Sequence, residues 1–137
     1  MKPRDSLFIM LTCSVLLGLL TTLFSHVIPE RIYAPAVAGV IVGFLLTPLV
    51  VKYGGGIVDV AVIGAIASLI GVLLATLVYY VVLGFQWQAI SQWTVIDYLI
   101  MMIRSGVFIV RFLTDFIIGS AALLSAAGLV AVLVVGE

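Results

Sequence analysis

Residues 57–83 read "IVDVAVIGAIASLIGVLLATLVYYVVL", and this stretch decides the fold. It contains one charged residue, Asp59, and no proline. As an α-helix it would be about 40 Å long at 1.5 Å per residue, whereas the hydrocarbon core of a bilayer is about 30 Å thick. The stretch therefore predicts a membrane-spanning helix that is tilted or protrudes from the bilayer.

The composition of the whole chain agrees with a membrane location. Hydrophobic residues make up 65% of the 137 residues and charged residues only 9%, whereas a soluble domain carries about 25% charged residues. The formal net charge is zero, and no basic or acidic run is present that would indicate a nucleic-acid partner. These numbers predict a single integral membrane domain, residues 1–137.

Three further stretches are apolar and long enough to cross a bilayer. Residues 7–27 contain no charge, and the run is too long for a cleaved signal peptide, which is the alternative interpretation. Residues 34–51 follow the polar turn "IPERIY" and end at Lys52 and "YGGG". With residues 57–83 and 116–135, they predict an all-α fold of four transmembrane helices in a small bundle.

The stretch before the last span differs from the others because it is charged. Thr94 and Asp97 form a capping-box-like start, and residues 95–135 then contain no proline and no clear turn signal. At helical spacing Asp97, Arg104, Arg111 and Asp115 share one stripe.

One bilayer crossing cannot hold forty helical residues. Burying each arginine at the bilayer centre would cost about 2.5–3.5 kcal/mol. We therefore expect residues 95–113 to form an amphipathic, interfacial helix, with Arg111 and Asp115 paired. The stripe is open to three interpretations: a solvated or lipid-anchoring face, a contact with another subunit, or a transport or ligand site.

Small residues recur at spacings of three and four in every predicted span, which favours close helix packing or self-association. The alternative is that such residues are simply common in membrane helices. The predicted packing residues are Ser14, Gly18, Thr21, Gly39, Gly43, Gly64, Ser68, Gly71, Ala75, Gly119, Ala122 and Ala126.

Two further patterns concern the membrane boundary. Aromatic residues mixed with glutamines predict an interface belt made of Tyr79, Tyr80, Trp87 and Trp93. The basic residues at 2, 4 and 52 would share one side of the membrane against Arg31 on the other, which predicts that both termini are cytoplasmic. Arg104 and Arg111 would make this count even if their helix lay on the outer leaflet.

The sequence indicates no catalytic or metal chemistry. His26 is the single histidine and Cys13 the single cysteine, so a metal cluster or a paired-histidine haem site is not expected. No nucleophile-elbow, zinc-protease or phosphate-loop motif occurs, so we expect neither an enzyme nor a cofactor. The sequence predicts a structural or assembly subunit that associates with the bilayer and with itself or other membrane subunits. The alternative is a small oligomeric transporter or channel that uses the charged stripe.

Overall fold

The computed structural model describes residues 2–28, 30, 33–92 and 94–135, which form five α-helices and contain no strand. Four of these helices are long and apolar enough to cross a membrane. This confirms the predicted helical class and the expected set of four apolar helices. The helices are α1 (Pro3–Val27), α2 (Tyr33–Lys52), α3 (Ile57–Ile90), α4 (Val95–Arg104) and α5 (Val107–Val135).

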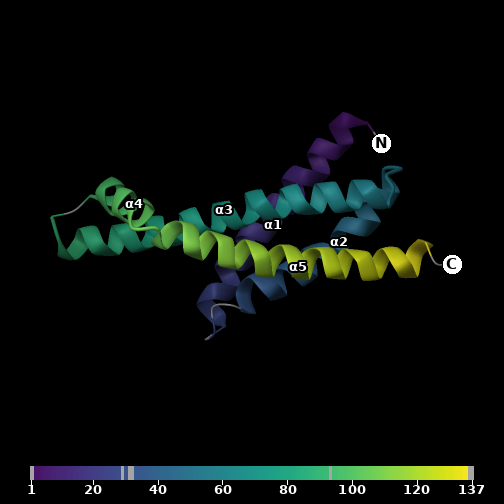
Figure 1. The fold of residues 1–137 in the computed structure, drawn as a ribbon. Helices are drawn as coiled ribbons and strands as arrows, with labels where there is room; N and C mark the ends of the chain where they lie inside the picture. Colours follow the sequence, from purple (N-terminus) through teal and green to yellow (C-terminus); the bar gives the residue numbers. More distant parts are fainter. Residues whose placement is uncertain (1, 29, 31–32, 93, 136–137) are drawn as a thin grey trace.

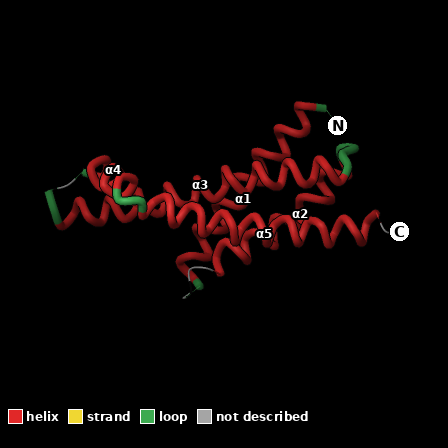
Figure 2. Tube along the Cα trace, viewed as in Figure 1, coloured by secondary structure: helices red, strands yellow, loops and turns green. Residues whose placement is uncertain are grey.

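Short turns join the helices, and local residue chemistry accounts for where the helices end (Figure 2). After α2, Gly54 adopts a φ of +82°, which a glycine reaches without steric cost. The Gly56 amide then donates to Asp59 Oδ2 at 2.9 Å, so that Asp59 caps the start of α3. At the start of α4, the Asp97 amide donates to Thr94 Oγ1 at 3.2 Å, as the capping pattern predicts.

The four long helices associate as two pairs, in which α1 packs on α3 and α2 packs on α5. Figure 1 shows α3 and α5 side by side, with α1 and α2 crossing them obliquely. The two ends of the chain lie at the end of the molecule opposite α4 (Figure 1). One apolar core joins the pairs and comprises Ile9, Cys13, Leu17, Ala38, Val42, Leu46, Val50, Val60, Ile63, Ala67, Val72, Leu123 and Ala127.

The contact between α2 and α5 brings the two backbones together. A Cβ atom added at Gly39 would lie 2.6 Å from the Gly119 carbonyl oxygen, and one at Gly43 would overlap the Leu123 carbonyl oxygen. One turn further along, Thr47 Oγ1 donates a buried hydrogen bond of 2.8 Å to the Ala127 carbonyl. Only glycine at these two positions allows this approach, because a side chain at either of them would force α2 and α5 apart.

The small residues of α3 face two different partners. A Cβ at Gly71 would lie 2.9 Å from the Ser14 carbonyl oxygen of α1, and one at Gly18 would lie 3.2 Å from the Gly71 carbonyl oxygen. A Cβ at Gly64 would instead lie close to leucine side chains of α2 and α5. The predicted stripe on α3 is therefore divided between two interfaces. Of the other predicted packing residues, Thr21, Ser68, Ala75, Gly119 and Ala126 are buried, and Ala122 is half-buried.

A turn between α4 and α5 corrects the expected course of the last segment. We expected one helical stretch that changes from interfacial to spanning between residues 113 and 116, but α4 ends at Arg104 and α5 already begins at Val107. Gly106 adopts a φ of +81°, a backbone conformation that glycine enters freely. Its amide donates to the Ile103 carbonyl at 3.2 Å, which closes the turn.

Replacing Gly106 by alanine should destabilise the fold by about 1 kcal/mol, because a Cβ disfavours this left-handed conformation. Gly128 is the matched control, since it is exposed in α5 and an added Cβ there meets nothing within 4 Å. Alanine at that position should leave the stability unchanged or raise it slightly. Denaturant unfolding in detergent micelles measures both variants, and equal stabilities would show that the turn imposes no strain on alanine.

Candidate functional site

The turn at Gly106 separates the four charged residues that were predicted to form one stripe. Asp97 and Arg104 lie exposed on α4, whereas Arg111 and Asp115 lie on α5 and are only 7% and 5% exposed. The single-stripe prediction is therefore wrong, because a helix periodicity does not extend across a break in the helix. The structure pairs Arg111 with Asp115, whereas Asp97 and Arg104 line a separate, open depression on α4.

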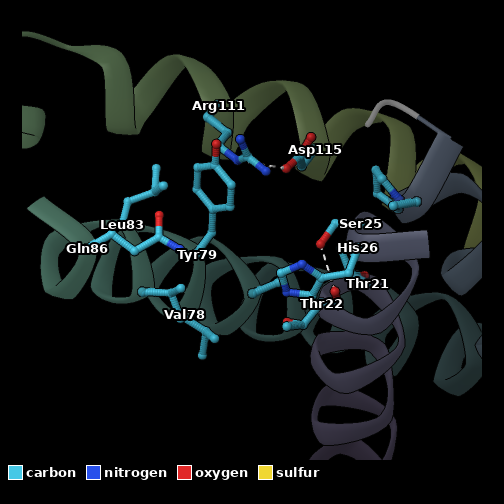
Figure 3. A pocket seen from close by; sticks show the side chains of 14 residues that line it. Thr21, Thr22, Ser25, His26, Val78, Tyr79, Leu83, Gln86, Arg111 and Asp115 are labelled. Carbon is cyan, nitrogen blue, oxygen red and sulfur yellow. Dashed lines mark hydrogen bonds and ion pairs between the residues drawn. The ribbon is translucent and has the colours of Figure 1, made fainter. Parts of the chain in front are cut away.

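Arg111 is held between a carboxylate and an aromatic ring. Its Nε lies 3.7 Å from Asp115 Oδ2, one helical turn along α5. Its Cζ lies 3.3 Å from the centroid of the Tyr79 ring on α3, and 5.9 Å from that of Tyr80. A guanidinium over an aromatic face gains from the ring quadrupole, the more so where water is excluded. Figure 3 shows the Tyr79 ring reaching from α3 to Arg111, with Asp115 beside the guanidinium on α5, at the wall of one cavity.

The cavity has a volume of about 120 Å³ and lies where α1 ends and α2 begins. Four helices contribute to its walls, and the imidazole of His26 and the amide of Gln86 lie across it from the pair (Figure 3). Its polar lining side chains are Thr21, Thr22, Ser25, His26, Tyr79, Gln86, Arg111 and Asp115. Guanidinium, imidazole, amide and hydroxyl groups thus offer hydrogen-bond donors around one space, with a single carboxylate among them.

Two of the hydroxyl groups at the cavity bond within α1. Thr22 Oγ1 donates to the Gly18 carbonyl at 2.8 Å, and Ser25 Oγ donates to the Thr22 carbonyl at 2.7 Å. The Thr21 hydroxyl is different, since the residue is 4% exposed and its Oγ1 has no hydrogen-bond partner among the described residues. A buried hydroxyl without a partner is costly, and folded proteins contain few of them.

Beside the cavity, an aromatic cluster attaches α4 to the end of α3. The buried members are Tyr80, Tyr98 and Phe108, with ring centroids of Tyr80 and Phe108 5.5 Å apart. Tyr80 was predicted as part of the membrane-interface belt, but it is only 4% exposed and packs inside the protein. Tyr79 is half-buried and Trp87 is exposed, whereas Trp93 lies outside the described residues.

No known protein family, curated protein or solved structure matches this chain. The function therefore has to be inferred from the geometry alone. Within the described residues, no group of three or more histidine, cysteine or carboxylate side chains is placed to hold a metal ion.

Sequence reasoning identified Arg111 and Asp115 as a pair and named Thr21, Ala75 and Tyr79 in other roles, but it did not assign the remaining wall residues to a site. Thr22, Ser25 and His26 lie in the last turns of the first span, where polar residues are expected at a membrane boundary in any case. The available signal was their density, because residues 21–26 contain four polar side chains. Gln86 gave no signal, since it lies in a run of aromatic residues and glutamines.

Proposed function

We propose that this chain is a structural subunit of a membrane assembly, with four transmembrane helices that hold α4 at the membrane surface for contact with other subunits. The supporting observation is the interior between the helices, where buried hydroxyl groups other than that of Thr21 bond to backbone carbonyls. Ser14, Ser68 and Thr76 each donate to the carbonyl four residues earlier at 2.7 to 2.8 Å. A transporter needs a polar route, and among the described residues the centre of the helices contains no charged side chain.

The positions of charged residues support this arrangement in the bilayer. Residues 6–25, 32–51 and 116–136 carry no Asp, Glu, Lys or Arg and no histidine, and each stretch is about 30 Å long as a helix. In α3 the distance from Asp59 to Tyr79, which contacts Arg111, is again about 30 Å. These four stretches support a position of Arg111 and Asp115 at one boundary of the hydrocarbon core, and of the three-glycine turn at the other.

The exposed faces of α4 support an interfacial position for this helix. Ile96, Ile100 and Ile103 are 69%, 44% and 50% exposed and occupy one side. Asp97 and Arg104 lie exposed beside them, so that one face suits lipid tails and the neighbouring face suits head groups or another chain. A ten-residue helix that is fixed by aromatic residues and exposes both kinds of side chain is suited to a contact surface.

Purification of a tagged chain from its native membrane after chemical crosslinking tests the proposal. We expect crosslinks from α4 to itself in a second copy or to another membrane subunit, and Arg104→Glu should reduce their yield by about tenfold if a carboxylate or phosphate is the partner. Arg4→Glu, on the exposed N-terminal end, is the control. Recovery of the chain without crosslinked partners would contradict the proposal.

The polar cavity favours a second candidate, a small oligomeric transporter or channel that uses Arg111 and Asp115. Such a protein would move a solute across proteoliposome membranes, and Arg111→Lys would reduce the flux without loss of the folded protein. A structural subunit would show no flux above that of empty liposomes. The flux assay therefore separates the two candidates independently of the crosslinking result.

The proposed orientation has both termini in the cytoplasm, because Lys2, Arg4 and Lys52 occupy that side. A C-terminal alkaline phosphatase fusion, which is active only outside the cytoplasm, should therefore be inactive. A C-terminal green fluorescent protein should be fluorescent in the same cells. The reverse pair of results would show that the positive charges of α4 and α5 decide the orientation instead.

A further inference from the structure

The polar cavity adjoins an apolar groove on the outside of the helices. The two share Thr22, His26 and Val78 as lining residues. The groove lies between α1 and α3, has a volume of about 530 Å³, and is lined almost entirely by carbon. Its other lining residues are Val15, Gly18, Leu19, Leu23 and Leu74.

The groove has the direction and length of a lipid tail. From His26 it follows α1 back to Val15, a distance of about 16 Å along the helix axis. Gly18 forms part of its floor, where α1 and α3 pack so closely that an added Cβ would lie 3.2 Å from the Gly71 carbonyl oxygen. Because residues 6–25 carry no charge, this course leads from the membrane boundary toward the bilayer centre.

We propose that the cavity and groove together bind one membrane phospholipid, with its phosphodiester in the cavity and one acyl chain in the groove. The Thr21 hydroxyl supports this occupant, since it is buried in the cavity wall without a hydrogen-bond partner among the described residues. A phosphate oxygen accepts a hydrogen bond from such a hydroxyl. The proposal concerns a ligand of the chain and does not depend on the structural role proposed above.

The charges around the cavity suit a singly charged phosphodiester. Arg111 offers five N–H donors, so one guanidinium can serve the Asp115 carboxylate and a phosphate together. Ala34 and Pro35, in the first turn of α2, also line the cavity. The positive end of the α2 dipole thus faces the same space as the guanidinium and partly offsets the negative charge of Asp115.

Native mass spectrometry of the delipidated full chain in detergent tests the site, with palmitoyl-oleoyl-phosphatidylglycerol as the titrated probe. The wild-type chain should bind one lipid with defined affinity, and Thr21→Val should weaken that affinity about tenfold by removing one hydrogen bond to a charged group. Thr12→Val is the matched control, because Thr12 is a half-buried threonine of α1 outside the cavity whose hydroxyl donates to the Phe8 carbonyl at 2.8 Å.

A second pair of variants tests the groove. Val78→Trp should fill the junction between cavity and groove and weaken binding at least about tenfold, whereas Val62→Trp, on the exposed face of the same helix, should not. Circular dichroism checks that each variant keeps its helices. Equal affinity within either pair overturns the proposal. So does binding of inorganic phosphate or deacylated glycerophosphoglycerol as tight as that of the lipid, which would show that the groove contributes nothing.

Discussion

Replacement of Arg111 by leucine is expected to destabilise the folded chain by about 3–5 kcal/mol, because it leaves the carboxylate of Asp115 buried without the cation that faces it. The two side chains are 7% and 5% exposed, so water cannot replace the lost partner. Leucine also gives up the contact with the Tyr79 ring. Unfolding by sodium dodecyl sulfate in mixed micelles, followed by circular dichroism, measures the change.

The double variant Arg111→Leu/Asp115→Leu provides the internal control for this prediction. Removing both charges should restore most of the stability, since a buried ion pair adds little net stability over apolar residues of similar volume. Arg104→Leu, at the exposed end of α4, should change the stability by less than about 1 kcal/mol. A double variant as unstable as the single one would contradict the buried-pair interpretation.

Replacement of Gly43 by leucine should have the second large effect, a loss of about 3 kcal/mol or failure to form the native helix packing. Even a single Cβ at this position would overlap the Leu123 carbonyl oxygen of α5. The same separation would break the hydrogen bond from Thr47 to the Ala127 carbonyl. Gly128→Leu is the control, because that glycine is exposed on α5 and its surroundings are open.

The measurement for Gly43→Leu is the distance between α2 and α5, obtained by double electron–electron resonance between spin labels on their exposed faces. Phe44 and Leu129 are exposed positions suited to the labels. The distance should increase or become broadly distributed in Gly43→Leu and stay unchanged in Gly128→Leu. An unchanged distance in both variants would show that α2 and α5 are not in backbone contact.

Much of the fold follows from the length of the apolar stretches. The hydrocarbon thickness imposes about 20 apolar residues per crossing, and four stretches of the sequence meet this requirement. Gly39 and Gly43 were predictable as packing positions for a different reason. Two glycines four residues apart in a membrane helix are typical of a close contact between helices.

The charged segment was less predictable, for an identifiable reason. Gly106 is a single glycine in a long apolar stretch, and an isolated glycine does not distinguish a helix interior from a turn. Without that break, Asp97 and Arg104 seemed continuous with Arg111 and Asp115. Within α5 the helical spacing does predict the contact, since Arg111 and Asp115 face each other one turn apart.

The cavity was beyond prediction because it depends on the relative position of helices. His26 and Arg111 are far apart in the sequence. They line the same cavity because α1 and α2 cross the α3–α5 pair obliquely (Figure 1). No pattern within a single helix encodes that crossing. Ridge-and-groove packing allows several crossing angles for the same small residues, and the choice among them is made by the whole interface.

We infer that Arg111 and Asp115 lie at the boundary of the hydrocarbon core and not within it. Site-directed spin labelling in lipid bilayers tests this most directly, with Cys13 replaced by alanine and single nitroxides at Leu113 and Leu124. Both positions are exposed on α5, and Leu113 lies at the level of the charged pair. Relaxation by oxygen and by a water-soluble nickel chelate should place Leu113 near the head groups and Leu124 deep in the bilayer. Equal depth at the two positions would place the charged pair inside the membrane and contradict the account.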